Sequence, residues 1–519
     1  MARRSTLRAG GGVLAGVWLA SGCDSGDDAG SGASAPAPTS SAPSPFSFPS
    51  SPSRSTAAPA SSDWKALAVS LDGSLIRPQD RTFDADSRLY NTRFDGLRPA
   101  AVAYVGGVDD VRACLDFARR TATPLAIRSG GHSYAGWSSG DGRLVLDVSR
   151  LDGVRLDGTE AVVGGGVKLI DLYSTLAARG RTVPGGSCPT VGVSGLTLGG
   201  GHGVMSRSMG LTCDNLLGAT LVTADGTVHE VSAEAEPEVF WALRGAGNGT
   251  FGVVTSLTFA THPAPEVVTG YLTWPWSRAA DVVRAWQSWG PEQPDPIWSA
   301  LHLDCDAGQA PAVSVAMLSS GSRADLAAAA DRLAALAGAA ASSVSLHPHD
   351  YVDAMFAYAG CQGLSAAQCH LAPQGTLGRE TYTARSDFYD APLPDGGIDT
   401  LLAQMRLLAN RSGGGAGSIA LTALGGAVNR VGPTATAFVH RRSRFLAQYL
   451  ASDGLSTTGW LATTYASLRR YASGAAYQNY TDPSLKDWRT AYYGANASRL
   501  TALKHQLDPG RLFDFPQAL

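Results

Sequence analysis

The strongest constraint on how this 519-residue chain folds is a long stretch of backbone that carries very little side chain, at residues 185–203. It reads GGSCPTVGVSGLTLGGGHG. Glycine has no Cβ, so such backbone can pass very close to something flat or phosphorylated. A Rossmann fingerprint would need a preceding strand and a following helix, and a Walker loop would need Gly-Lys-Ser or Gly-Lys-Thr, so neither motif explains the segment. The remaining structural reading is a glycine-rich bend between strands.

A second, shorter glycine loop lies upstream, at residues 128–133, with the sequence RSGGHS. It directly follows a run typical of a strand, so two glycines and successive backbone N–H groups would face whatever lies beyond that strand. This is the arrangement that a pyrophosphate requires. Taken alone, a Gly-Gly pair is also a common turn, and the loop becomes informative only beside other motifs.

Composition excludes several partner classes. The chain is 44% hydrophobic and 16% charged with a net charge of −3, so neither nucleic acid nor an acidic membrane surface is an expected partner. There is no Cys-x-x-Cys and no paired histidine spacing, which leaves no predicted metal site. Among the seven cysteines, Cys361 and Cys369 lie close together in a loop-like stretch and are the easiest disulfide to propose.

The N-terminus resembles an export signal. Arg3 and Arg4 precede an apolar run at residues 10–20, which favours a twin-arginine signal over residues 1–23, with an ordinary secretory signal as the alternative. The run ends in LASGC, similar to a lipobox whose Cys23 would carry lipid, although Ala20 stands where such boxes usually have leucine. A simple cleaved secretory protein is therefore also open. Residues 24–62 are nearly all Ser, Ala, Pro, Gly and Asp, and predict a disordered tether.

The body of the chain reads as an α+β protein. Residues 102–105, 124–128, 144–148, 161–164 and 251–260 predict strands, residues 168–179 predict a helix that Gly180 caps, and Val111, Leu115 and Ala118 mark one face of another helix. Asp225-Gly226 predicts a hairpin. We expect a nucleotide-binding region at 63–262, a substrate-binding region of antiparallel sheet backed by helices at 263–470, and a C-terminal segment at 471–519 that returns to the first region.

Four motifs together carry a family resemblance: the two glycine loops, the sequence FWALRGAG at 240–247, and YQNY at 477–480. With the tail from Trp488 to Gln517, the chain resembles the berberine bridge enzyme-like FAD-linked oxidases over residues 98–519. The resemblance implies a PCMH-type, or vanillyl-alcohol-oxidase-type, FAD-binding domain in two parts, with the substrate domain inserted between them.

The resemblance also implies a bicovalent cofactor. His132 would attach to the 8α carbon of the flavin and Cys188 to C6, which suits a neutral imidazole and a thiolate meeting an electron-poor ring. The alternatives are a turn histidine and a small buried cysteine or disulfide partner. The residues expected along FAD are Arg128, Ser129, Gly130, Gly131, His132, Ser133, Cys188, Val191, Gly192, Val193, Gly195, Gly199, Gly200, Gly201, His202, Gly203, Gly252, Val254, Tyr477 and Asn479.

Hydride transfer from an alcohol requires a base that accepts the hydroxyl proton, and the resemblance points to Tyr477. A phenol with an ordinary pKa of about 10 needs stabilisation of its phenolate to act at neutral pH. The alternative role for Tyr477 is packing or substrate stacking. Tyr382 and Tyr389 are expected as helpers from the substrate region.

The predicted function is an exported FAD-dependent oxidase that oxidises an alcohol or hemiacetal of a saccharide or glycosylated small molecule. Members of the family that the chain resembles differ in O2 access at the position three residues after the cysteine, and by this resemblance the small Val191 favours O2 as the acceptor, with H2O2 as product. The main alternative is a dehydrogenase that uses a quinone or protein acceptor, and the family scaffold also modifies antibiotics and alkaloids. A non-enzymatic surface lipoprotein that binds flavin or sugar is the third. Contact with a membrane is expected only through a lipid at Cys23.

Overall fold

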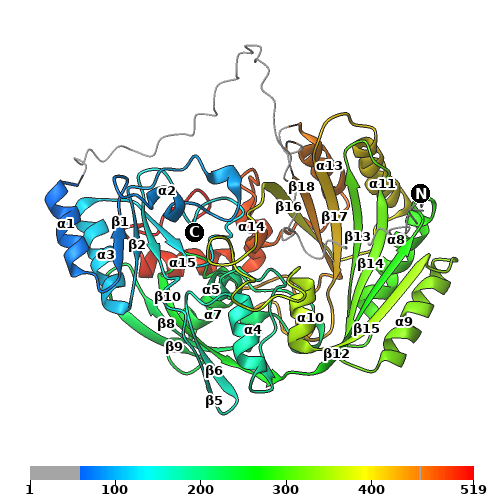
Figure 1. The fold of residues 1–519 in the computed structure, drawn as a ribbon, viewed down its shortest axis with the longest axis horizontal. Coiled ribbons are helices and arrows are strands. Elements are labelled where there is room, and N and C mark those ends of the chain that lie inside the picture. The colour runs from blue at the N-terminus through cyan, green and yellow to red at the C-terminus, as the bar shows by residue number, and fades with distance from the viewer. Residues whose placement is uncertain (1–58, 453, 455–457) are drawn as a thin grey trace, which may run out of the picture.

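The computed structural model describes residues 59–452, 454 and 458–519 (Figure 1). The expected signal peptide with Cys23, and the tether up to residue 58, lie outside the described residues. Helix α1 (Ser61–Ser70) begins inside the last part of the expected tether. Trp64 and Leu67 of this helix are buried, and Trp64 packs against Phe117. Residues 61 and 62, which the composition assigned to the tether, therefore belong to a helix.

A four-stranded sheet forms the first part of the N-terminal region. Its order is β1-β2-β4-β3, with β2 and β3 each parallel to β4. Helix α3 (Val108–Thr121) connects β2 to β3 and buries Val111, Leu115 and Ala118, as predicted. The strands are β1 (Ser74–Ile76), β2 (Ala101–Tyr104), β3 (Leu125–Arg128) and β4 (Leu144–Asp147).

An antiparallel five-stranded sheet of order β5-β6-β10-β8-β9 forms the second part. The hairpin of β8 and β9 turns at Asp225-Gly226, where Gly226 has a φ of 86°. The glycine segment holds a short helix, α5, that the sequence did not predict. The elements are β5 (Val154–Asp157), β6 (Glu160–Gly164), α4 (Leu169–Ala177), β7 (Arg181–Thr182), α5 (Val193–Leu198), α6 (Ser206–Met209), β8 (Leu216–Val222), β9 (Val228–Ser232), α7 (Pro237–Ala246), β10 (Val253–Ala260) and β11 (His262–Pro263).

The middle of the chain forms a seven-stranded antiparallel sheet of order β15-β12-β14-β13-β17-β18-β16. Helices α8, α9, α11 and α13 cover its outer face, and its inner face looks toward the N-terminal region (Figure 1). The elements are β12 (Glu266–Trp274), α8 (Ala279–Trp289), β13 (Ile297–Asp306), β14 (Ala312–Ser319), α9 (Arg323–Leu336), β15 (Ser343–Asp350), α10 (Tyr351–Tyr358), β16 (Tyr382–Tyr389), α11 (Asp395–Ala409), β17 (Ala416–Ala423), β18 (Phe445–Ser452) and α13 (Trp460–Arg469). The predicted α+β fold class is confirmed.

The C-terminal segment packs back onto the N-terminal region (Figure 1). It contains α14 (Trp488–Tyr493) and α15 (Ala497–Leu507), and α15 contacts α7. Lys504 holds this segment in place although its side chain is buried. Its Nζ donates to the carbonyl oxygens of Thr250 at 2.7 Å and Phe513 at 2.8 Å, and to Asp508 Oδ2 at 2.6 Å. Thr250 lies in the loop before β10 and Phe513 lies near the chain end, so the Lys504 ammonium joins these two segments.

The disulfide between Cys361 and Cys369 is present, as proposed from their spacing. It closes the loop that follows α10. His370, next to the bridge, hydrogen-bonds Asp171 of α4 at 3.0 Å, which ties this loop to the N-terminal region. Within the described part of the chain, none of the helices combines the length and the apolar character needed to cross a bilayer.

We expect Lys504→Met to lower the free energy of unfolding by about 3–5 kcal/mol, because it leaves the Asp508 carboxylate buried without its cation. The control is Arg155→Met, which removes one partner of an exposed pair with Asp157 and should cost less than about 1 kcal/mol. Urea unfolding followed by tryptophan fluorescence measures both. Equal, small losses in the two variants would contradict the anchoring role of Lys504.

Candidate active site

A cavity of about 340 Å³ lies between the N-terminal region, the inner face of the seven-stranded sheet and the C-terminal segment. Both glycine loops contribute to its wall. Strands β13, β17 and β18 supply its far side, and residues 477–481 of the C-terminal segment border it. All three parts of the chain that the sequence singled out therefore meet at one site.

The two glycine loops touch through their backbones. A Cβ on Gly130 would lie 2.2 Å from the backbone nitrogen of Gly192, and a Cβ on Gly192 would lie 2.2 Å from Ser129 Oγ. Side chains at either position would hold the loops apart. The contact places the loop of His132 directly beside the loop of Cys188, and it explains why glycine is required at both points.

A buried ion pair fixes the start of the first loop. Arg128 and Asp147 lie opposite each other at the ends of β3 and β4, and their side chains form a salt bridge in the interior. Lys168, the residue before α4, donates from Nζ to the carbonyl oxygen of Ser129 at 2.8 Å. Burial lowers the pKa of Lys168 to about 8. Its ammonium is thus held beside the loop.

His132 is held as a neutral imidazole. Its ring stacks on Tyr90 with centroids 4.0 Å apart, and its Nε2 hydrogen-bonds Thr190 Oγ1 at 2.8 Å. Burial, with a smaller effect of the nearby Lys168 charge, lowers the pKa of His132 to about 3. At neutral pH the ring therefore keeps a nitrogen lone pair, which is the form that can act as a nucleophile.

Cys188 also lines the cavity and is half-buried. Its loop is held against α4 by two backbone hydrogen bonds. The N–H of Leu169 donates to the carbonyl oxygen of Val191 at 3.0 Å, and the N–H of Ile170 donates to the carbonyl oxygen of Pro189 at 3.1 Å. The loop therefore has a fixed position relative to His132, whose ring contacts Thr190 of the same loop.

Tyr477 is buried, and its phenolic oxygen is surrounded by N–H donors. It accepts hydrogen bonds from the backbone N–H of Gly201 at 2.9 Å and from Asn479 Nδ2 at 2.8 Å. Burial raises the pKa of Tyr477 above its usual range, and the donors, including the backbone N–H of His202, act in the opposite direction. These donors cannot accept a proton, so the phenolic hydrogen must be directed elsewhere.

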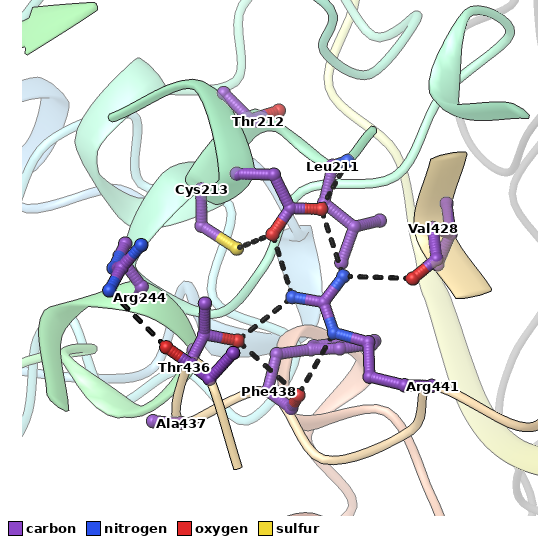
Figure 2. Close-up of polar contacts among 12 residues, drawn as sticks. Leu211, Thr212, Cys213, Arg244, Val428, Thr436, Ala437, Phe438 and Arg441 are labelled. Atoms are coloured by element: carbon purple, nitrogen blue, oxygen red, sulfur yellow. Dashed lines mark hydrogen bonds and ion pairs between the residues drawn. The ribbon is translucent and has the colours of Figure 1, made fainter. Parts of the chain in front are cut away.

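The loop that donates to Tyr477 is supported by a buried ion pair, shown in Figure 2. The guanidinium of Arg441 donates to both carboxylate oxygens of Asp214, at 2.8 and 2.7 Å. Two residues before Asp214, the N–H of Thr212 donates to the carbonyl oxygen of Gly201 at 2.8 Å. The N–H of Cys213 donates to Gly200 at 2.9 Å. The pair therefore fixes, through two backbone contacts, the N–H that faces Tyr477.

Most of the predicted site residues line the cavity, namely Ser129, Gly130, Gly131, His132, Ser133, Cys188, Val191, Gly192, Gly195, His202, Gly203, Gly252, Val254, Tyr382, Tyr477 and Asn479. The others lie behind this wall. Arg128 fixes β3 to β4, Val193 is buried in the core, and Gly199, Gly200 and Gly201 support Tyr477 and Asn479 from behind.

The helper role expected for Tyr389 is wrong. Alternation along β16 places Tyr382 on the inner face of the sheet and Tyr389 on the outer face. There the Tyr389 hydroxyl hydrogen-bonds the hydroxyl of Tyr449 at 2.9 Å, and its ring stacks on Phe445. Both tyrosines were predicted without a strand register, and the odd spacing between them was the signal that only one could face the site.

Several cavity residues were not found from the sequence: Tyr134, Trp137, Asn248, Trp298, His302, Thr422, Gln448, Gln478, Tyr480, Phe515 and Gln517. Tyr480 belongs to the YQNY motif and could have been included, since its hydroxyl hydrogen-bonds His202 at 2.8 Å. The residues of the sheet could not, because they are distributed over three strands, β13, β17 and β18, and only the strand register brings them together.

Comparison with known proteins agrees with this geometry. Residues 99–232 match the model of an FAD binding domain, and residues 476–519 match the model described as berberine and berberine like. The xylooligosaccharide oxidase of Thermothelomyces thermophilus is 32% identical over 461 residues, covering 84% of this chain and 89% of the relative. The chain belongs to the berberine bridge enzyme-like family of FAD-linked oxidoreductases.

Two solved structures of this family have the same fold. BBE-like 1 of Physcomitrella patens superposes with a TM-score of 0.81 at 29% identity, covering 88% of this chain and 98% of that one. The glucooligosaccharide oxidase of Acremonium strictum, whose structure is described as revealing a novel flavinylation, gives a TM-score of 0.78 at 26% identity, with 88% and 99% covered. This chain thus binds FAD and acts as an oxidoreductase on CH–OH groups, as predicted.

The residues present fit FAD. Gly195 lines the cavity, and a Cβ at this position would meet no atom within 4 Å, so bare backbone faces the space that the cofactor requires. At Gly131, a φ of 72° permits the loop to turn His132 into the cavity wall. The wall is mainly glycine, aromatic and aliphatic, with few charged side chains, which suits a large flat ring system.

We expect Gly130→Ala to lower the fraction of chains that carry FAD by roughly tenfold, because the new Cβ separates the two loops. This factor corresponds to a loss of about 1.4 kcal/mol in the free energy of FAD binding. Flavin absorbance per chain measures the fraction. The control is Gly153→Ala, where the Cβ would meet no atom within 4 Å, and circular dichroism verifies that both variants fold. Normal FAD loading of Gly130→Ala would show that the loop contact is not required.

Proposed function

We propose that this protein is an exported oxidase with FAD attached to both His132 and Cys188, and that it oxidises an alcohol or hemiacetal of a saccharide or glycosylated small molecule with O2 as acceptor and H2O2 as product. The observation that carries the proposal is the placement of Tyr477. Its oxygen is held by N–H donors at the wall of the cavity that His132 and Cys188 also line.

Tyr477 is the base in this proposal. FAD supplies the hydride acceptor, and the protein must take the proton of the substrate hydroxyl. The donors Gly201 and Asn479 favour the phenolate, since a hydrogen bond to the charged form of a group stabilises it. Gly201 and Asn479 only donate to the phenolic oxygen, so neither can accept its proton. In this proposal the remaining hydrogen-bonding direction of the oxygen is used by the substrate hydroxyl. The ring is held by edge contacts with Phe438 and Tyr480.

His132 and Cys188 are the attachment points. The imidazole is neutral, as a nucleophile must be, and its Nε2 is engaged by Thr190, so we expect the bond to form at Nδ1. Contact between the two loops brings Cys188 to the same cavity. The flavinylation named for the glucooligosaccharide oxidase supports a covalent cofactor in this chain.

The saccharide class rests on the relatives and on the cavity wall. Two of the three proteins compared above are named as a xylooligosaccharide oxidase and a glucooligosaccharide oxidase. Tyr134 and Tyr480, whose rings stack with centroids 5.0 Å apart, give the wall the aromatic surface on which sugar rings rest. The small Val191 beside Cys188 leaves room for O2. Export follows from the leader and tether, with Cys23 either lipidated or removed.

Covalent attachment is tested by acid precipitation and intact mass. We expect the wild-type pellet to stay yellow and its mass to exceed that of the chain by one FAD. His132→Ala and Cys188→Ala should each keep one bond and therefore retain the colour, and the double variant should lose it. A colourless wild-type pellet would show that the flavin is not covalently bound.

We expect Tyr477→Phe to lower kcat by about 10²–10⁴-fold with full FAD content, because it removes the proton acceptor and keeps the ring. The matched control is Tyr389→Phe, whose hydroxyl lies outside the cavity and whose loss should leave kcat near the wild-type value. Oxygen uptake and peroxide formation with a panel of saccharides measure the activity. Unchanged turnover in Tyr477→Phe would contradict the base assignment, and substrate oxidation with a quinone in place of O2 would identify a dehydrogenase.

A further inference from the structure

Among the described residues, two ring side chains of strand β13 that line the cavity have buried ring nitrogens without a hydrogen-bond partner. His302 is 2% exposed, and both of its ring nitrogens are unpaired. Trp298 lies on the same strand, β13, and its Nε1 is also unpaired. Leaving such groups buried without a partner costs about 1–3 kcal/mol each. Because both residues line the cavity, a bound ligand with hydroxyl groups would supply the missing hydrogen-bond partners.

Strand register connects His302 to the site of Tyr477. His302 pairs with Ala420 of β17, Ala420 pairs with Gln448 of β18, and Gln448 pairs with Ser386 of β16. Residues directly opposite in neighbouring strands share a face of the sheet, so these four side chains form one row across the inner face. The Ser386 hydroxyl accepts the backbone N–H of Tyr477 at 3.0 Å. The row thus begins at Tyr477 and ends at His302.

In this row the small residue Ala420 lies between two polar residues, Gln448 and His302. Gln448 donates from Nε2 to the hydroxyl of Tyr134 at 2.8 Å, which joins it to the aromatic wall near Tyr477. His302 lies two strands further along, about 10 Å from Gln448 at the usual strand spacing. Between them the side chain of Ala420 reaches only a short way into the cavity. Ala300 and Thr422, in the next row, are also short. The result is a shallow floor.

We propose that this floor, bordered by His302, Trp298 and Gln448, is a second saccharide subsite that binds the sugar ring next to the one oxidised at Tyr477. The inference rests on the proposed saccharide oxidase function and specifies its substrate as at least a disaccharide. A neutral imidazole offers one donor and one acceptor, and the indole offers one donor, which together match adjacent sugar hydroxyls. Burial lowers the pKa of His302, with Asp304 acting weakly in the opposite direction, so the ring is neutral.

The test compares disaccharides with their own monosaccharides: xylobiose with xylose, cellobiose with glucose, and chitobiose with N-acetylglucosamine. We expect His302→Phe to raise KM for the disaccharide substrate by about 10–100-fold, the equivalent of two lost hydrogen bonds, and to raise KM for its monosaccharide far less. Anaerobic flavin reduction gives Kd and the limiting rate separately, and the change should fall on Kd.

Three variants complete the design. His302→Gln keeps one donor and one acceptor and should restore most of the disaccharide affinity. Trp298→Phe removes the indole N–H together with the five-membered ring and keeps one aromatic ring, and should raise KM for the disaccharide by about tenfold. His347→Phe changes an exposed histidine on edge strand β15 and serves as the matched control.

The outcomes separate the two proposals. A disaccharide-selective loss in His302→Phe and Trp298→Phe supports the subsite. If wild type oxidises a disaccharide and both variants bind it equally well, or lose the monosaccharide to the same extent, the subsite is overturned and the proposed function stands. If wild type neither binds nor oxidises any of these sugars, the saccharide function is overturned and the subsite with it.

Discussion

The contact between Gly130 and Gly192 is the constraint on which the rest of the site depends. One glycine comes from the loop after β3 and the other from the loop before α5, and neither loop has room for a Cβ where they meet. The arrangement makes a single wall out of two segments about sixty residues apart, and it places His132 and Cys188 on that wall. Arg128 and Lys168 support the first loop from behind, so the wall is rigid before a cofactor is bound.

The opposite wall is built on a different principle. On the inner face of the seven-stranded sheet, strand register decides the neighbours of each side chain. The function of this face depends on which residue occupies each inward-facing position. Tyr382, Gln448 and His302 are on this face, and Tyr389 is not, because alternation along a strand allows no exception without a bulge. One wall therefore holds the cofactor through backbone, and the other can vary its side chains without changing the fold.

The sequence predicted what depends on local pattern. The strand, helix and strand before His132, the Asp225-Gly226 hairpin, the fold class and the disulfide of Cys361 with Cys369 were all predicted correctly. The family motifs identified FAD and the class of reaction. Helix α5 was missed because it is short. Between Gly192 and Gly199 only four residues have side chains larger than those of glycine and serine, which is too few to show helical periodicity. His302 and Trp298 were missed because their importance comes from pairing across β13, β17 and β18, which no local pattern encodes.

The ion pair of Asp214 with Arg441 joins the N-terminal region to the middle region that carries the seven-stranded sheet. Asp214 follows the glycine segment, and Arg441 lies between β17 and β18 of the large sheet, with side chains that are 9% and 0% exposed. Pulling the two regions apart would break both hydrogen bonds of this pair, at 2.8 and 2.7 Å, between side chains that pack in the interior. The regions are thus expected to move as one body. Turnover would then proceed without a hinge, with the substrate entering a cavity whose walls keep their relative positions.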